Sequence, residues 1–162
     1  MRTLIVYSTK YGTTARCARM LAERIRGGAD PADLADTPTP SLAGYDTVLI
    51  GGAIHAGRIR PAVRRFCDRA RSALLARRVG LFICCLYTGE RAQAQLDEAF
   101  PAWLSGHAFA RRALGGAVRM SALGPVDRFL FRKITGMSED IERIDDAAIT
   151  ALAEAAAGGA PG

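Results

Sequence analysis

The sequence predicts an α/β fold in which a parallel sheet lies between two layers of helices. Short apolar runs alternate along the chain with segments of helical periodicity. The apolar runs are continuous, as in strands that are buried on both faces. The chain has 162 residues, 49% of them hydrophobic and 23% charged, which is enough for one domain with a full core. We therefore expect a single domain over residues 1–157 and a flexible tail over residues 158–162.

The expected elements follow one another as strand, loop and helix. The expected strands are rich in β-branched and aromatic residues. They are Thr3–Tyr7, a weak edge strand at Asp33–Asp36, Tyr45–Gly52, Val79–Tyr87 and Ala113–Met120. The expected helices repeat apolar residues at spacings of three and four. They are Thr14–Ile25, Ala62–Leu75, Gln93–Leu104 and Ala148–Ala157. Pro61 suits the first position of the second helix, and Pro101 must bend or break the third.

Composition excludes several classes of protein. The longest apolar stretch, Val79–Tyr87, is far shorter than the roughly 20 residues of a membrane span. The N-terminal run ends at the polar Ser8, before the apolar core of a signal peptide is complete. We therefore expect a cytoplasmic protein. The four cysteines lack Cys-x-x-Cys spacing and the two histidines lie far apart, which predicts buried thiols and no metal site.

The charge is unevenly distributed. Residues 1–138 contain 21 Lys and Arg against 10 Asp and Glu, whereas residues 139–162 contain one against six. A basic body indicates an anionic partner such as a phosphate ligand or an acidic membrane surface, or only a bias of solvated faces. The segment Arg58–Arg78 carries eight of the arginines. It too either attracts an anionic partner or only forms a solvated face. Apart from Phe66 it lacks the interleaved aromatic residues of nucleic-acid platforms, so no nucleic-acid partner is expected.

Three loops follow the expected strands at the edge of the sheet where α/β proteins bind ligands. They are Ser8–Thr14, Gly52–Arg60 and Tyr87–Arg91. The first combines hydroxyls, Gly12 and free N–H groups at a helix start, which predicts a phosphate site; an ordinary helix cap is the alternative. The loop lacks the Gly-Lys-Ser/Thr ending of a Walker loop and the Gly-x-Gly-x-x-Gly pattern of dinucleotide-binding proteins. ATP and NAD are therefore disfavoured as ligands.

The same loop resembles that of flavodoxins. Thr9, Gly12 and Thr14 match the pattern Ser/Thr-x-Thr-Gly-x-Thr, and Tyr11 stands where flavodoxins usually have threonine. The resemblance implies a flavodoxin-like three-layer sandwich, a five-stranded parallel sheet of order 2-1-3-4-5, and FMN as the cofactor.

A wider resemblance is to the menaquinone-dependent protoporphyrinogen IX dehydrogenases, which are flavodoxin-like. It rests on the first loop, on residues 45–58 with Phe66, on residues 116–119 and on residues 127–138. It implies an FMN-dependent oxidoreductase that oxidises a porphyrinogen-like substrate and passes the electrons to a quinone. The alternative is a flavodoxin-type electron carrier without its own substrate, although such carriers are typically acidic. We name no catalytic side chain, because the flavin performs the redox chemistry.

The resemblance also implies a set of cofactor-binding residues. The FMN phosphate would be bound by Thr9, Lys10, Tyr11, Gly12, Thr13 and Thr14. One edge of the flavin would be lined by Ala53, Ile54, His55, Ala56 and Gly57, and the other by Cys85, Leu86, Tyr87 and Thr88. Tyr87 would stack on the flavin or only pack, and His55 would contact a ligand or only face solvent. We expect His107 to be structural.

The segment Pro125–Ile134 mixes large apolar residues with three bases. This composition is typical of a helix that rests on a membrane surface or covers a hydrophobic substrate, and it equally suits an amphipathic helix packed on the sheet. The first interpretation adds peripheral contact with the inner face of the cell membrane to the expected cytoplasmic location.

Overall fold

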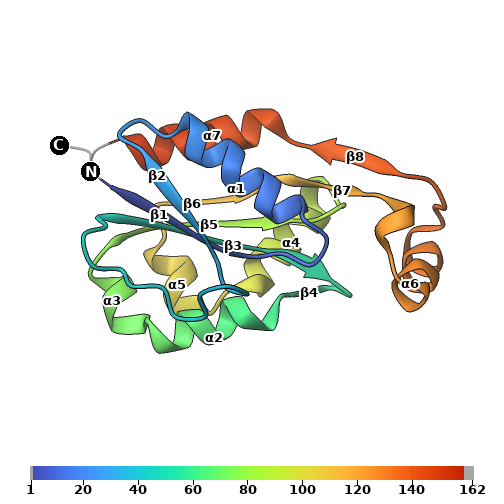
Figure 1. The fold of residues 1–162 in the computed structure, drawn as a ribbon, viewed down its shortest axis with the longest axis horizontal. Helices are drawn as coiled ribbons and strands as arrows, with labels where there is room; N and C mark the ends of the chain where they lie inside the picture. Colours follow the sequence, from blue (N-terminus) through green and yellow to red (C-terminus); the bar gives the residue numbers. More distant parts are fainter. Residues whose placement is uncertain (1, 159–162) are drawn as a thin grey trace.

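The computed structural model describes residues 2–158 and has a parallel sheet at its centre (Figure 1). The sheet has the order β2-β1-β3-β5-β6. Its strands are β1 (Thr3–Ser8), β2 (Ala29–Asp33), β3 (Thr47–His55), β5 (Arg78–Cys84) and β6 (Ala110–Ala113). All neighbours in this path are parallel. Numbered in chain order, these strands give 2-1-3-4-5, so the predicted flavodoxin-like fold is confirmed.

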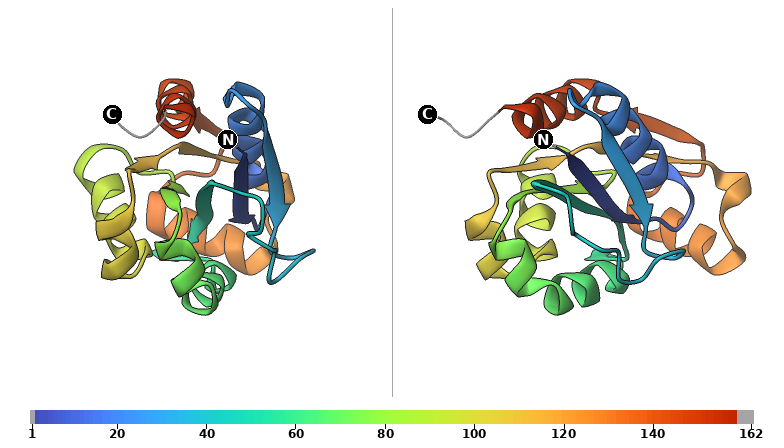
Figure 2. Two further views of the ribbon diagram at one scale, coloured as in Figure 1. Left: turned by 90° about the vertical axis from the view of Figure 1, so that its left-hand side faces the viewer. Right: turned by 60° about the vertical axis from the view of Figure 1, so that its left-hand side comes forward.

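Helices cover both faces of the sheet (Figures 1 and 2). One face carries α1 (Thr13–Arg24) and α7 (Asp146–Ala157). The other carries α2 (Pro61–Arg69), α3 (Arg71–Leu75), α4 (Gly89–Ala99) and α5 (Ala102–His107). Neighbouring residues of a central strand enter different layers: Leu49 packs with the first group of helices and Ile50 with the second, and both are fully buried. The continuous apolar strands therefore build two cores.

Three short strands, a 3-10 turn and one helix lie toward the carboxyl ends of the parallel strands. The strand β4 (Arg58–Ile59) pairs antiparallel with β3. The strands β7 (Gly115–Val118) and β8 (Ile141–Ile144) form a separate antiparallel pair. A 3-10 turn at Met120–Ala122 leads to α6 (Pro125–Thr135), at the right-hand end of the molecule in Figure 1. Both ends of the described chain lie at the opposite end of the molecule.

Two strand predictions were wrong in position. The edge strand is Ala29–Asp33, not Asp33–Asp36. Its residues are polar or small and none is buried, so it has no apolar pattern, and Pro31 is tolerated because the strand lies at an edge. The fifth parallel strand is Ala110–Ala113, whereas most of the predicted segment 113–120 forms β7 and the turn after it.

The proline predictions were confirmed. Pro61 is the first residue of α2, and Pro101 separates α4 from α5. The predicted helix 62–75 is divided at Ala70 into α2 and α3. Of the predicted tail, residues 159–162 lie outside the described residues.

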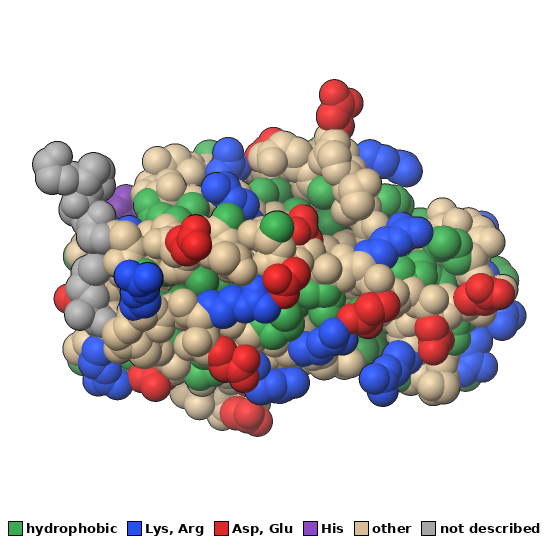
Figure 3. Space-filling model, turned by 90° about the horizontal axis from the view of Figure 1, so that it is seen from above, with side chains coloured by type: hydrophobic (Ala, Val, Ile, Leu, Met, Phe, Trp, Pro, Cys, Tyr) green, Lys and Arg blue, Asp and Glu red, His purple; other side chains and the backbone are tan. Residues whose placement is uncertain are grey.

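The described structure bears on the cysteines, on His107 and on the arginines. All four cysteines are buried free thiols, and burial raises the pKa of Cys67 to about 12. His107 Nε2 lies 2.7 Å from the carbonyl oxygen of Arg77, a structural contact. Arg77 and Arg78 themselves donate to backbone carbonyls, so the arginine-rich segment is not one solvated face. On the face that carries α1 and α7, acidic and basic side chains alternate (Figure 3).

Within residues 2–158, no helix combines the length and hydropathy of a membrane span.

Candidate functional site

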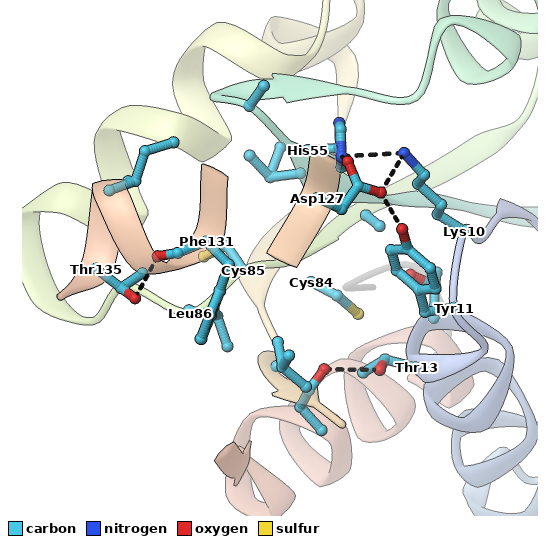
Figure 4. A pocket seen from close by; sticks show the side chains of 18 of the residues that line it. Lys10, Tyr11, Thr13, His55, Cys84, Cys85, Leu86, Asp127, Phe131 and Thr135 are labelled. Carbon is cyan, nitrogen blue, oxygen red and sulfur yellow. Dashed lines mark hydrogen bonds and ion pairs between the residues drawn. The ribbon is translucent and has the colours of Figure 1, made fainter. Parts of the chain in front are cut away.

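The three predicted loops meet around one cavity of about 210 Å³ at the carboxyl edge of the sheet (Figure 4). Every predicted cofactor-binding residue except Gly12 and Thr88 lines it. Gly12 forms the turn within the first loop, and Thr88 precedes α4 beside a second depression. That these residues bind a cofactor stays a prediction.

The first loop turns sharply and leaves donors unpaired. Gly12 has a φ of 92°, a left-handed conformation that glycine adopts without strain, and its N–H donates to Thr9 Oγ1 over 2.9 Å. The helix α1 then begins at Thr13 without a side-chain cap. The backbone N–H groups of its first turn therefore have no capping partner and face the ligand edge of the sheet.

The hydroxyls of the loop have different partners. Thr13 Oγ1 donates to the carbonyl oxygen of Ala117 over 3.1 Å. Thr14 is fully buried, and its hydroxyl makes no hydrogen bond with the described residues. The polar group beside it is the thiol of Cys84, which is a weak partner. An anionic oxygen at the start of α1 would satisfy both this hydroxyl and the free N–H groups, so the loop fits a phosphate.

The second loop is a tight hairpin between β3 and β4. Ala56 and Gly57 have φ values of 51° and 78°, the signature of a two-residue turn that matches the twist of the strands. Among the described residues Ala56 is the single non-glycine residue with positive φ. Such strained positions cluster at binding sites. The turn presents Ala53–Gly57 as one wall of the cavity.

The third loop is held in place by β7. The N–H of Cys85 donates to the carbonyl oxygen of Gly115 over 3.1 Å. A Cβ on Gly116 would lie 2.9 Å from the carbonyl oxygen of Cys85, so only glycine allows this approach. The guanidinium of Arg91 lies 4.4 Å from the centre of the Tyr87 ring. One face of Tyr87 is therefore covered, and stacking on a flavin would use the other.

A charged cluster joins α6 to the first two loops (Figure 4). Asp127 of α6 accepts a hydrogen bond from Tyr11 and lies 2.8 Å from Lys10 Nζ and 3.0 Å from His55 Nε2. Lys10 Nζ also lies 3.0 Å from His55 Nε2. His55 Nε2 donates a hydrogen bond to Asp127 when it carries a proton, and it accepts one from Lys10 when it does not. We call these four residues the Asp127 cluster. His55 thus has defined partners in the site and is not merely a solvated loop residue.

The cluster perturbs the acidity of two members. The Lys10 ammonium, the Tyr11 hydroxyl and His55 hold the pKa of Asp127 well below its usual range. Burial and the hydrogen bond to Asp127 raise the pKa of Tyr11. Asp127 is therefore a carboxylate and Tyr11 a neutral phenol across the physiological range.

Several residues that line the cavity were not predicted. They are Cys84, Gln95, Gly116, Ala117, Val118, Leu123, Asp127, Leu130, Phe131, Ile134 and Thr135. Those of α6, apart from Thr135, belong to the segment interpreted as a membrane, substrate-covering or sheet-packed helix. The sheet-packed interpretation was wrong, because none of the described residues of α6 is buried. The amphipathic composition was the available signal for this wall, whereas nothing in the sequence indicated the partners of Asp127.

A loop that fits a phosphate, beside an apolar cavity at the carboxyl edge of a parallel sheet, is typical of nucleotide-cofactor proteins of the α/β class. Residues 4–145 match the family model described as flavodoxin domain, and the chain belongs to that family. The family identifies FMN as the cofactor, and the unpaired donors of the loop fit its phosphate.

Solved structures share the fold at low identity. The chain is 20% identical to the two-electron reduced flavodoxin of Megasphaera elsdenii, with a TM-score of 0.59, covering 96% of this chain and 98% of that one. For a WrbA-like flavodoxin protein of Agrobacterium tumefaciens the identity is 16%, the TM-score 0.59 and the coverage 96% of both chains. For the rubredoxin oxygen:oxidoreductase of Desulfovibrio gigas the identity is 15% and the TM-score 0.60; the match covers 96% of this chain but 35% of that larger one. No curated protein matches the chain.

Proposed function

We propose that the protein is an FMN-dependent oxidoreductase that oxidises a porphyrinogen-like or another small hydrophobic substrate and passes the electrons to a quinone. The observation that carries the proposal is α6. Its Leu130 and Phe131 form an apolar wall of the same cavity that the cofactor loops line. A flat hydrophobic reactant would therefore have a site against the flavin, separated from water by this helix.

Each part of the cavity has a distinct task in this proposal. Bound FMN supplies the transfer of electrons. The first loop would bind its phosphate, and Ala53–Gly57 and Leu86, which line the cavity, would contact the flavin ring. His55 Nε2 lies 3.0 Å from both Asp127 Oδ1 and Lys10 Nζ, so it exchanges hydrogen bonds with either group at the edge of the cavity. The exposed Arg58 and the half-buried Arg60 flank the second loop and favour an anionic substrate such as a carboxylate-bearing porphyrinogen.

The outer face of α6 supports the proposal that the electron acceptor is a quinone dissolved in a membrane. Val126, Phe129 and Ile134 are 71%, 63% and 56% exposed, and the bases Arg132 and Lys133 lie among them. Exposed apolar side chains next to basic ones suit the surface of an anionic bilayer, where a hydrophobic quinone would be dissolved. Peripheral membrane contact through residues 125–134 is part of the proposal.

A flavodoxin-type electron carrier is the second candidate. It is favoured by the match to the Megasphaera elsdenii flavodoxin, which covers 96% of this chain and 98% of that one. The candidates differ in what reduces the flavin. An enzyme is reduced by its own substrate, whereas a carrier needs a reductase.

The test is anaerobic. The FMN-loaded protein is mixed with a porphyrinogen, the flavin absorption is followed, and a soluble quinone is then added. Bleaching by the porphyrinogen and recovery with the quinone are expected. A flavin that porphyrinogen leaves oxidised, but that cycles with a flavodoxin reductase, would establish the carrier.

A further inference from the structure

The helix α6 is attached to the rest of the protein mainly through one side chain. None of its described residues is buried, in contrast to the two cores beneath the sheet. The guanidinium of Arg128 donates to the carbonyls of Met120 and Leu123, within the segment that leads into the helix. The hydroxyl of Thr135 donates to Phe131, within the helix itself. These contacts stabilise α6 and the segment that leads into it, but they do not fix the helix over the cavity.

Asp127 makes the contacts that cross the cavity. Among residues 2–158, its carboxylate makes the only side-chain hydrogen bonds and ion pairs between α6 and the cofactor loops. Lys10 and Tyr11 belong to the first loop and His55 to the second, so one carboxylate connects three elements. The side chain of Asp127 is 16% exposed, so these interactions are weakly screened by solvent.

The cluster also depends on the charge of this carboxylate. Lys10 Nζ and His55 Nε2 are 3.0 Å apart. Without the negative charge of Asp127 between them, a protonated His55 and Lys10 would repel each other. Loss of Asp127 therefore removes the attachment of α6, and it adds repulsion between the two loops whenever His55 is protonated.

We infer that Asp127 is a positioning residue of the flavin site, which anchors α6 across both cofactor loops and so slows the release of FMN. The inference rests on the assignment of FMN and is independent of which substrate reduces it. With α6 anchored, Leu130 and Phe131 close one side of the cavity. With α6 released, the cofactor has an open path to solvent.

The experiment compares FMN-loaded wild type with Asp127→Asn, Asp127→Glu and the control Glu139→Gln. Glu139 is an exposed carboxylate in the chain that follows α6, and it makes no ion pair with the described residues. The rate of FMN dissociation is measured from the recovery of free-flavin fluorescence after dilution. Hydrogen exchange of the α6 amides is measured on the same samples, with α7 as the internal reference.

The Asp127→Asn protein should release FMN at least tenfold faster and lose exchange protection in α6, with α7 unchanged. The Asp127→Glu protein should recover part of both effects, because it restores the charge, and Glu139→Gln should stay within twofold of wild type. If Asp127→Asn does not fold, Tyr11→Phe, which removes one hydrogen bond to the carboxylate, should accelerate release by a smaller factor.

Three results would overturn the inference. One is unchanged release and exchange in Asp127→Asn. Another is tighter FMN binding in that variant, which would mean that Asp127 competes with the phosphate for Lys10. The third is a wild-type protein that does not retain FMN, which would also refute the cofactor assignment. Failure of porphyrinogen oxidation alone would refute the proposed substrate and leave the role of Asp127 intact.

Discussion

Replacing Thr14 by valine should move stability and cofactor affinity in opposite directions. The Thr14 hydroxyl is fully buried and has no hydrogen-bond partner among the described residues. A buried unpaired polar group costs about 1–3 kcal/mol. Valine keeps the shape of threonine without this group, so the cofactor-free protein should gain stability, by about 1 kcal/mol if half of the cost is recovered.

FMN affinity should fall in the same variant. In the cofactor complex the hydroxyl would donate to a phosphate oxygen, and a hydrogen bond to a charged group contributes about 1.5–3 kcal/mol. At about 1.4 kcal/mol for each factor of ten, its loss should raise the FMN Kd about 10- to 150-fold. Adding Gly12→Val should weaken binding further, because a side chain at a φ of 92° strains the loop.

Two measurements check this prediction: fluorescence titration with FMN and urea unfolding of the cofactor-free protein. The matched control is Thr13→Val. The Thr13 hydroxyl already donates to Ala117, so this variant should lose about 1 kcal/mol of stability and change the Kd less than Thr14→Val does. An unchanged Kd for Thr14→Val, or a cofactor-free variant that is less stable than wild type, would refute the reasoning.

Three further predictions concern α6 and the arginines at the cavity. Phe129→Ser should reduce binding to anionic vesicles while changing the free energy of unfolding by less than about 0.5 kcal/mol, since Phe129 is 63% exposed. Leu75→Ser, at an exposed apolar residue of α3, is the control, and equal losses in both variants would argue against a membrane face on α6. The pKa of Asp127 is lowered on folding, so its stabilisation of α6 is complete above the unfolded pKa of about 3.9 and is lost as the pH falls below it. Hydrogen exchange of α6 relative to α7 should therefore be constant from pH 7 to about 4 and rise in acid; a loss of protection centred above pH 5 would contradict this. Charge reversal at Arg58 and Arg60 should raise the KM for a porphyrinogen more than it lowers kcat, and wild-type activity should fall as salt rises, whereas a flat salt series would show that these arginines do not attract the substrate.

The sequence was informative where a local pattern determines the structure. The buried strands are continuous apolar runs, so β1, β3 and β5 could be placed from composition alone. The first loop could be identified because its hydroxyls and Gly12 are adjacent in the chain. The edge strand β2 was misplaced because its five residues, Ala-Asp-Pro-Ala-Asp, owe their conformation to backbone pairing with β1 and not to any burial of their own.

The candidate site was predicted only in part, because some of its contacts are distant in sequence. Asp127 lies 116 residues after Tyr11 and 72 after His55. A single aspartate at the start of an amphipathic helix is ordinary in the first turn, where it also complements the helix dipole. Its role follows only from the position of α6 over the two loops, which depends on the path of the chain through β7 and the turn at Met120–Ala122.

The position of α6 also bears on the choice between an enzyme and a carrier. A carrier exchanges electrons across a contact between protein surfaces, so an open flavin edge serves it best. Here Leu130 and Phe131 stand at the cavity, and the Asp127 carboxylate ties their helix to both cofactor loops. A protein partner docked on the outside of α6 would be separated from the flavin by the thickness of that helix. A small hydrophobic reactant would instead lie within the cavity, between α6 and the flavin. The same helix that slows FMN release in our inference therefore favours a reactant that enters the cavity, which is the condition for an enzyme with its own substrate.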